Sequence, residues 1–204
     1  RRIIPPLLFV ITISIPFAWL YLLPVELIDY SKSILHSLGF ISNYYFYFAD
    51  IEYGSLDSFL KPFLHTWSLS IEEQFYIIFP ILILIIFKYL RSYWFYIFII
   101  FFFVNLFYSN FNSKLHSSQN FYLITGRIWE LILGSLLSFL YLKLKRYEGN
   151  QFVNNIFIFI ALCLISYAIF TYDDTMRHPS IHTLLPLTGV SFFILFSTEN
   201  NPFL

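Results

Sequence analysis

The feature that most constrains this chain is a series of long apolar segments separated by short polar links. A helix needs about 20 predominantly apolar residues to cross the hydrocarbon core of a membrane. No segment alternates apolar and polar residues as a membrane-spanning strand does. The sequence therefore predicts an all-α fold, a polytopic membrane helix bundle. The candidate spanning segments are 3–23, 31–49, 75–90, 92–108, 121–142, 152–172 and 183–196.

The composition excludes several other classes of protein. Of the 204 residues, 58% are hydrophobic and only 12% are charged, whereas about 25% of residues are charged in soluble domains. So little charge cannot cover a water-facing surface, and the hydrophobicity is too high for a disordered chain. Basic and acidic residues cancel at 12 each, so there is no electrostatic footprint for nucleic acid. A single cysteine, Cys163, cannot form an internal disulfide or a thiolate metal site.

Segment 31–49 differs from the other candidates because polar residues interrupt its apolar run. Cytoplasmic loops carry an excess of Lys and Arg, and this excess distinguishes two topologies. If the segment crosses the membrane fully, the basic cluster at 143–146 falls outside. If it enters and returns on the outer side, the cytoplasmic side holds most of the basic residues. They are Arg1, Arg2, Lys88, Arg91, Lys143, Lys145 and Arg146. We therefore expect about six full spans plus one re-entrant or interfacial segment, with residues 50–74 on the extracytoplasmic side.

Residues 61–80 carry a dense group of polar and ionisable side chains next to an apolar run. Ionisable groups at a membrane edge are costly and mark a functional site or a buried pair. We expect His65, Glu72 and Glu73 to take part in general acid–base chemistry, because each can shift the pKa of the others. A second interpretation is structural: Ser70 would cap a helix that begins after it, and Glu73 would complete the capping box.

The run from His65 to Tyr76, His-Thr-Trp-Ser-Leu-Ser-Ile-Glu-Glu-Gln-Phe-Tyr, resembles the hallmark motif of the membrane-bound acyltransferase-3 family. Other stretches resemble the family pattern in the same order along the chain. They are Arg2-Ile3-Ile4-Pro5, Ser42-Asn43-Tyr44-Tyr45-Phe46, Arg127-Ile128-Trp129-Glu130 followed by Gly134, and His178-Pro179 with Leu185-Pro186. The resemblance covers nearly the whole chain.

The resemblance implies an integral membrane O-acyltransferase. Such an enzyme moves an acyl group, usually acetyl, from acyl-CoA to a hydroxyl of a cell-envelope carbohydrate such as O-antigen, exopolysaccharide or peptidoglycan. Acyl-CoA is then a donor substrate, and no bound cofactor is expected. The expected partners are the donor, the carbohydrate acceptor and the lipid bilayer. The expected location is the cytoplasmic (inner) membrane of a bacterium.

The resemblance also implies that residues 1–204 form a partial acyltransferase-3 transmembrane domain, truncated at both ends. Family members have two helices before the point that corresponds to Arg1, and the first of these carries the histidine usually held to be catalytic. We therefore expect this chain alone to be inactive. Its own residues would support a site whose main catalytic histidine lies upstream.

Arg127 and Glu130 are spaced i, i+3 on one face of segment 121–142. They are either a mutually neutralised pair that fixes helix packing or residues that line the site. Gly126 and Gly134, each four residues from Glu130, would allow close approach by a neighbouring helix or a ligand. Under the resemblance, Arg127 and Glu130 line the site, and Arg127 contacts the CoA phosphates or the acyl carbonyl.

The remaining candidates are expected to bind substrates. Arg2 either satisfies the positive-inside rule at the inner end of the first span or binds a phosphate of acyl-CoA. Trp67, Ser68 and Gln74 are expected to bind substrate within the hallmark motif.

His178 and His182 have the spacing of a metal-binding pair, but Pro179 between them argues against one continuous helix, so no metal site is expected. Two other functional classes compete with the enzyme. A transporter or polysaccharide flippase would also use intramembrane Arg and Glu, and a non-catalytic membrane scaffold would need neither donor nor acceptor.

Overall fold

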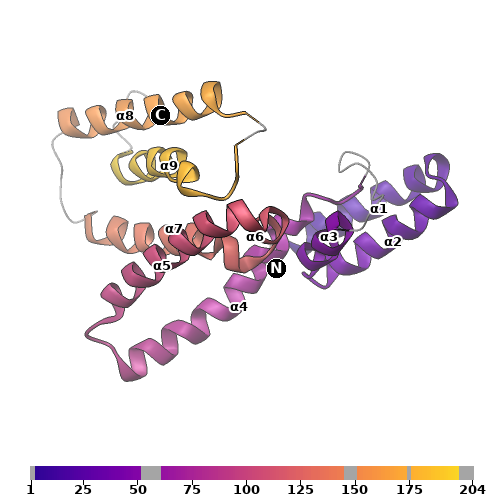
Figure 1. Ribbon diagram of the computed structural model, residues 1–204, viewed down its shortest axis with the longest axis horizontal. Helices are drawn as coiled ribbons and strands as arrows, with labels where there is room; N and C mark the ends of the chain where they lie inside the picture. The colour runs from indigo at the N-terminus through magenta and orange to yellow at the C-terminus, as the bar shows by residue number, and fades with distance from the viewer. Residues whose placement is uncertain (1–2, 52–60, 145–150, 174–175, 198–204) are drawn as a thin grey trace. The chain divides into compact units, whose positions relative to one another are not determined.

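The computed structural model of the chain describes residues 3–51, 61–144, 151–173 and 176–197. Every regular element within these ranges is helical (Figure 1). In chain order they are α1 (Ile4–Tyr21), α2 (Pro24–Leu38), α3 (Ser42–Ile51), α4 (Thr66–Tyr89), α5 (Trp94–Leu115), α6 (Ser117–Tyr122), α7 (Ile124–Leu144), α8 (Gln151–Thr171), the short 3-10 turn η2 (Ile181–Thr183) and α9 (Leu184–Phe196).

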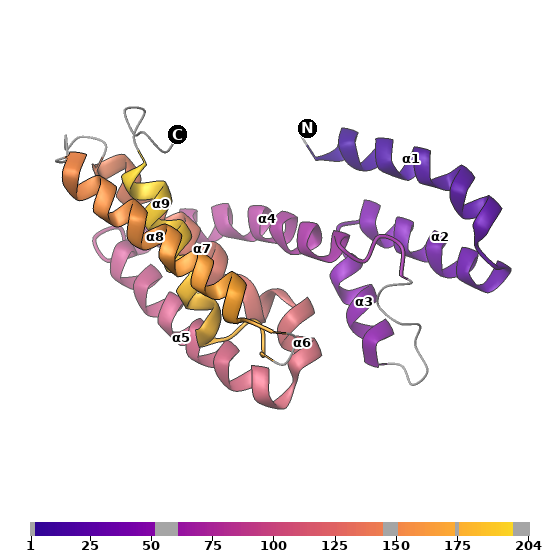
Figure 2. The ribbon, with the colours of Figure 1, turned by 90° about the horizontal axis from the view of Figure 1, so that it is seen from above.

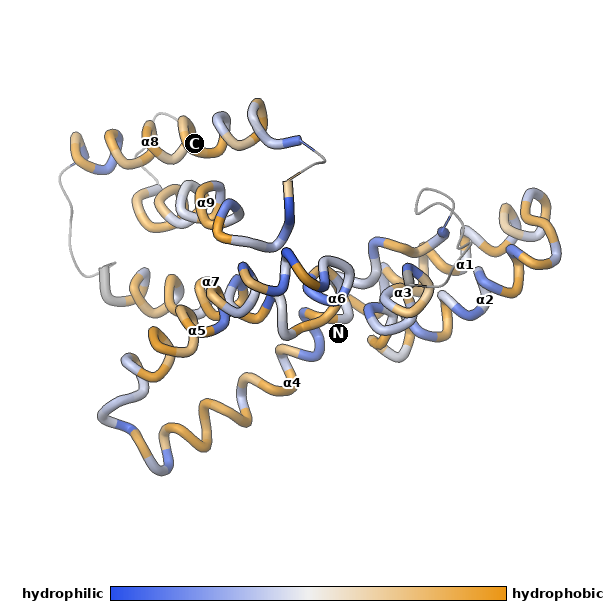
Figure 3. Tube along the Cα trace, viewed as in Figure 1, coloured by the Kyte–Doolittle hydropathy of each residue, from blue (hydrophilic) through white to orange (hydrophobic). Residues whose placement is uncertain are grey.

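Five described helical segments are long and apolar enough to cross a membrane. They are α1, α4, α5, the segment Ser117–Leu142 that covers α6 and most of α7, and α8. The sixth expected span is shorter, because its helix α9 has 13 residues. Apolar residues run along the length of these helices, and many of the polar residues gather at their ends (Figure 3). The predicted fold class, an all-α polytopic membrane bundle, is confirmed.

The chain divides into two compact units, Arg1–Tyr76 and Ile77–Leu204. In the first unit, the predicted segment 31–49 is not one helix. It is divided between α2, with 15 residues, and α3, with 10 residues. Neither helix reaches the length of a spanning helix, so the structure agrees with the expectation that 31–49 is not a full straight span.

A Schellman motif produces the break between α2 and α3. The backbone N–H of Ile41 donates to the carbonyl of His36 over 2.9 Å, and that of Phe40 donates to the carbonyl of Ser37 over 3.2 Å. This motif places one residue in the left-handed region, where glycine is preferred. Here the residue is Phe40, with φ of 52°. The turn therefore holds a bulky residue in a backbone conformation that costs about 1–2 kcal/mol.

Helix α4 begins at Thr66, well before the apolar segment 75–90 and also before the start after Ser70 that the capping box predicts. The apolar composition alone did not indicate this first turn. Thr66 stabilises the helix start itself: its Oγ1 donates to the carbonyl of Phe63 over 2.7 Å. Ser70 consequently lies inside α4, and its hydroxyl donates to the carbonyl of Thr66 over 3.2 Å. The predicted capping box of Ser70 and Glu73 is therefore wrong.

The second unit is built from two helix pairs. Helix α5 packs along α7, and the short α6 connects them at one end; α8 packs along α9, and α7 contacts α9 (Figures 1 and 2). The α8–α9 contact is close at Gly189, where an added Cβ would lie 3.0 Å from the carbonyl oxygen of Ala161. Phe157 on α8 stacks on Phe196 of α9 with ring centroids 4.2 Å apart.

Candidate functional site

Part of the hallmark motif forms a buried polar contact between α3 and α4 in the first unit. The hydroxyls of Ser42 and Ser70 lie 2.7 Å apart, and Thr66 Oγ1 lies 3.0 Å from Ser42 Oγ. Ser37 at the end of α2 joins the same cluster, with its hydroxyl 2.7 Å from that of Thr66. In an apolar interior these groups must bond to one another. The cluster therefore fixes how α2, α3 and α4 meet.

Gln74 extends this cluster by one turn of α4. Its Nε2 donates to the backbone carbonyl of Phe40 over 3.0 Å and to Asn43 Oδ1 over 2.9 Å. The strained backbone at Phe40 thus presents its carbonyl to Gln74. We call the set Ser42, Asn43, Thr66, Ser70 and Gln74 the α3–α4 joint.

Helix α4 places the other motif residues on different faces. Thr66, Ser70 and Gln74 recur at intervals of four and share the face of the joint. At about 100° per residue, Ser68 and Glu72 lie about 160° and 200° round the helix from Ser70, and Glu73 lies about 60° from it. The motif is therefore not one cluster of side chains, and Glu73 is the carboxylate nearer the joint.

The acid–base candidates at the start of α4 lie outside this network. His65 is exposed and immediately precedes the helix, while Glu72, Glu73, Trp67 and Ser68 are half-buried. Ser68 Oγ donates to the carbonyl of His65 over 3.1 Å. Among the described residues, neither glutamate has a hydrogen bond or ion pair. Their predicted acid–base role stays a prediction.

The second unit contains an ion pair inside a candidate membrane span. Arg127 Nη1 lies 3.4 Å from Glu130 Oε2, and the two side chains are 21% and 19% exposed. Arg127 Nε also donates to the backbone carbonyl of Phe121 over 3.0 Å, and its guanidinium lies over the Phe121 ring, 4.7 Å from the centroid. The predicted pairing of Arg127 and Glu130 is confirmed.

This pair keeps one carboxylate oxygen available. Glu130 Oε1 is buried and has no hydrogen-bond partner among the described residues, and the same holds for the indole N–H of Trp129. Trp129 is fully buried and packs against Phe102 of α5 with ring centroids 6.0 Å apart. An unsatisfied acceptor beside a bound guanidinium is a place where a hydroxyl or amide donor can bind.

A buried amide connects this helix start with the loop after α8. Asn120 Nδ2 donates to the carbonyl of Pro179 over 2.8 Å and to the backbone carbonyl of Ser109 over 3.0 Å. The Ser109 hydroxyl also donates to the carbonyl of Pro179, over 3.2 Å. Gly126 is essential to this arrangement, because an added Cβ would lie 2.6 Å from Asn120 Oδ1 and still closer to the Asn120 carbonyl oxygen. The prediction of close approach is confirmed at Gly126. At Gly134 no described atom lies within 4 Å of an added Cβ, so the expectation of close approach there stays a prediction.

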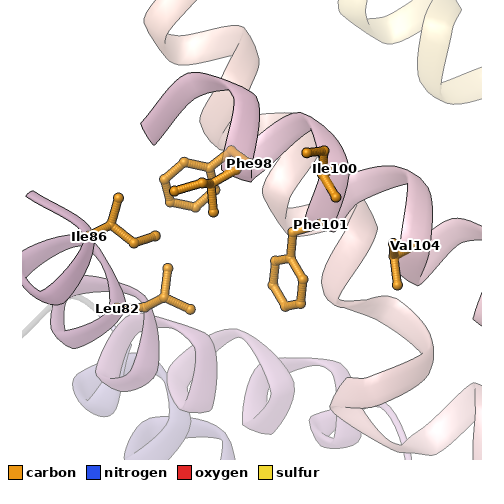
Figure 4. Close-up of a pocket in the computed structure, with 7 residues that line it drawn as sticks. Leu82, Ile86, Phe98, Ile100, Phe101 and Val104 are labelled. Atoms are coloured by element: carbon orange, nitrogen blue, oxygen red, sulfur yellow. The ribbon is translucent and has the colours of Figure 1, made fainter. Parts of the chain in front are cut away.

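An apolar hollow of about 340 Å³ lies between α4 and α5 in the second unit. Leu82 and Ile86 line it from α4, and Phe98, Phe101 and Val104 are among the residues that line it from α5 (Figure 4). Every side chain that lines it is aliphatic or aromatic, so this hollow has no group for acid–base chemistry.

The predicted site residues therefore fall into separate groups. His65, Trp67, Ser68, Glu72, Glu73 and Gln74 belong to the first unit, and Arg127 and Glu130 belong to the second. Arg2 lies outside the described residues. Sequence reasoning missed the structural role of Thr66 and Ser70, although their i, i+4 spacing with Gln74 signals a shared helical face. It also missed Asn120, for which no local pattern gave a signal. In the part of the chain that the structure describes, no three His, Cys, Asp or Glu side chains gather as a metal site.

Comparison with known proteins gives two kinds of relative. An uncharacterized protein of Haemophilus influenzae is 31% identical over 178 residues, which covers 83% of this chain and 72% of that protein. The O-acetyltransferase OatA of Staphylococcus aureus is 31% identical over 83 residues. That match covers 41% of this chain but only 13% of OatA. No protein-family model matches the chain, and no solved structure matches it.

The match to OatA indicates a relationship to O-acetyltransferases over part of the chain. The match to the Haemophilus influenzae protein extends over most of both sequences. On that match, this chain belongs to the same family as the Haemophilus influenzae protein.

Proposed function

We propose that this chain is part of an integral membrane O-acyltransferase of the acyltransferase-3 type, which transfers an acyl group, most simply acetyl, to a hydroxyl of a cell-envelope carbohydrate. The observation that carries the proposal is the 31% identity to the O-acetyltransferase OatA over 83 residues. A buried arginine–glutamate pair within a candidate span supports it, because ionisable groups kept inside a membrane mark functional sites.

The proposed reaction is acyl transfer from acyl-CoA. The acceptor hydroxyl oxygen attacks the thioester carbonyl, the carbon–sulfur bond breaks, and CoA leaves as the thiol with the hydroxyl proton, which passes through a general base. Donors near the carbonyl stabilise the oxyanion that forms during the attack. We assign this supporting work to His65, Glu72, Glu73, Arg127 and Glu130, with the main catalytic histidine upstream of Arg1.

The positions of Arg127 and Lys143 near opposite ends of α7 suggest different roles for Arg127 and Arg2. Arg127 lies at the start of α7, and Lys143 lies near its other end, about 24 Å away at 1.5 Å per residue. If the basic cluster at 143–146 is cytoplasmic, Arg127 lies toward the extracytoplasmic side. Arg2 is then the better candidate for a CoA phosphate, and Arg127 for the acyl carbonyl or the acceptor. The enzyme would lie in the cytoplasmic membrane of a bacterium.

The test uses membrane vesicles from cells that express the complete reading frame, supplied with labelled acetyl-CoA and envelope polysaccharide. We expect label to enter alkali-labile ester, and we expect Arg127→Gln to lower the rate about 100-fold. The matched control is Arg91→Gln, which removes an exposed arginine between α4 and α5 and should leave the rate unchanged.

The pair Glu72→Gln and Glu73→Gln sharpens this test, because the two residues are neighbours on different faces of α4. A larger loss of transfer rate in Glu73→Gln than in Glu72→Gln would assign the reaction to the face of α4 nearer the α3–α4 joint. No transfer from any acyl-CoA by the wild-type protein would contradict the proposal and favour a transporter, flippase or scaffold.

A further inference from the structure

The loop between α8 and η2 is bound to α5 and α6, which both contact α7, the helix that carries the Arg127–Glu130 pair. Asn120 and Ser109 both donate to the carbonyl oxygen of Pro179, over 2.8 and 3.2 Å. The backbone N–H of Ile181 donates to Asn110 Oδ1 over 3.3 Å. Pro179, Asn120 and Ser109 are all buried. This loop is therefore held at a defined place against α5 and α6.

Two ionisable side chains are next in sequence to residues of this contact. His178 immediately precedes the clamped Pro179, and Arg127 immediately follows Gly126, whose Cα packs against Asn120. One buried amide is thus in contact with the backbone neighbours of both His178 and Arg127. Burial lowers the pKa of His178, and the positive charge of Arg127 lowers it further, followed by His182.

We propose that Asn120 is a positioning residue: by holding the carbonyl of Pro179 it places the His178 imidazole beside Arg127, so that His178, Arg127 and Glu130 together bind the hydroxyl-rich acceptor. The binding role rests on the proposed function, whereas the positioning role rests on the contacts alone.

The chemistry of the three side chains suits a polyol. A neutral imidazole has one donor and one acceptor nitrogen, a guanidinium only donates, and a carboxylate only accepts. Glu130 Oε1 has no partner among the described residues, so a hydroxyl of the carbohydrate can donate a hydrogen bond to it. His178 is half-buried, so its ring remains partly accessible to a ligand.

Two further side chains, Tyr172 and His182, belong to the surroundings of His178. The Tyr172 ring at the end of α8 lies 5.9 Å from the His178 ring, and its hydroxyl donates to the carbonyl of His182 over 2.7 Å. His182 lies in η2 and also acts on the pKa of His178. The test therefore has to separate the effect of Arg127 from that of His182.

The first measurement needs no turnover. Diethyl pyrocarbonate modifies neutral imidazole, so its rate of reaction with His178, followed by peptide mass spectrometry against pH, reports the pKa of that side chain. The complete protein in detergent should show a midpoint below the ordinary value of 6.5. We expect Arg127→Gln and Asn120→Ala both to shift the midpoint upward, and Ser109→Ala to shift it less. His182→Gln measures the separate contribution of His182.

The control variant is Asn155→Ala on α8, whose buried Oδ1 has no partner among the described residues. It also removes a buried amide, yet it should leave the His178 midpoint in place. If Asn120→Ala fails to fold, Ser109→Ala still removes one of the two donors to Pro179. An unchanged His178 midpoint in both Asn120→Ala and Ser109→Ala would overturn the positioning role.

The second measurement is the KM for the carbohydrate acceptor in the vesicle assay. Loss of the clamp should raise this KM about tenfold, as expected for about 1.4 kcal/mol of lost binding, with kcat changed less. A shifted midpoint without any turnover in the wild type would support the positioning role and contradict the proposed function. Normal turnover with an unchanged acceptor KM in Asn120→Ala would overturn the binding role of His178.

Discussion

The α3–α4 joint and the Arg127–Glu130 pair both place polar side chains on apolar helices, but they differ in charge. The joint consists of neutral hydroxyls and amides, bonded over 2.7–3.2 Å to one another and to the backbone, and Asn43 Nδ2 is its one buried group without a partner among the described residues. The pair carries two opposite charges 3.4 Å apart, and one oxygen of Glu130 has no partner among the described residues.

From this difference in charge we infer that the joint serves packing and that the pair serves binding. A neutral network of hydroxyls and amides bonded to one another rigidifies the contact between helices. A charged pair costs more to bury and is weak support for stability, so the presence of Arg127 and Glu130 within an apolar span requires another reason. The proposed function gives such a reason, because Glu130 Oε1 has no partner among the described residues and a ligand could donate to it.

The largest effect should come from breaking the pair. Arg127→Gln leaves Glu130 buried without its partner, which typically destabilises a protein by about 3–5 kcal/mol. We expect a marked fall in the unfolding temperature, measured in detergent by size-exclusion chromatography of heated samples.

The double variant Arg127→Gln/Glu130→Gln removes both charges. It should recover most of the lost stability, because two neutral amides need no counter-charge, but it should not recover acyl transfer. Full recovery of transfer would show that the pair serves packing alone, as the joint does.

The next effect distinguishes two glycines on α7. At Gly126 an added Cβ would collide with the backbone of Asn120, whereas at Gly134 no described atom lies within 4 Å. Gly126→Ala should therefore destabilise the protein by about 1–3 kcal/mol. Gly134→Ala should stabilise it by about 0.5–1 kcal/mol, because alanine is the better helix former. Equal unfolding temperatures for the two variants would contradict the close approach of α6 and α7.

Much of the fold follows from the sequence, because a membrane leaves few alternatives. Spanning helices need long apolar runs and satisfy their backbone hydrogen bonds internally. The apolar segments therefore predicted the positions of the long helices. The start of α4 was missed because Thr66, Ser70 and Gln74 are polar. Their side chains bond to α3 and to nearby backbone carbonyls, so the helix continues through residues that an apolar criterion excludes.

The site was predictable where its residues are close in sequence. Arg127 and Glu130 are one helical turn apart, so their pairing follows from spacing. Asn120 and Pro179 are 59 residues apart, and only the packing of α5, α6 and the loop after α8 brings them together. The shared face of Thr66, Ser70 and Gln74 was predictable from their i, i+4 spacing, but the α3 side chains that this face contacts were not.

A smaller effect tests whether the α3–α4 joint serves packing. Gln74→Ala removes the donor to Phe40 and Asn43, and buried acceptors left without a donor cost about 1–3 kcal/mol. Ser68→Ala, on the opposite face of α4, removes one local bond to His65 and should change stability by less than about 0.5 kcal/mol. If both variants unfold at the same temperature, the joint does not hold the helices. If Gln74→Ala abolishes acyl transfer while the protein stays fully folded, the joint binds a substrate and the contrast with the charged pair fails.

The smallest effect is a pH dependence that belongs to the second unit. The folded protein lowers the pKa of His178 through burial, Arg127 and His182, so the unfolded chain takes up this proton first as the pH falls. Stability should therefore decrease as the pH falls through the unfolded value near 6.5, until His178 is also protonated in the folded state. Because His178 is partly exposed and screened by water, the loss between pH 7 and 5 should be roughly 0.5 kcal/mol or less. His178→Gln should remove this part of the slope of unfolding temperature against pH, and Arg127→Gln should reduce it, whereas Gln74→Ala in the joint should leave the slope unchanged. A slope that persists in His178→Gln would assign the acid sensitivity to another group and separate His178 from the charged pair.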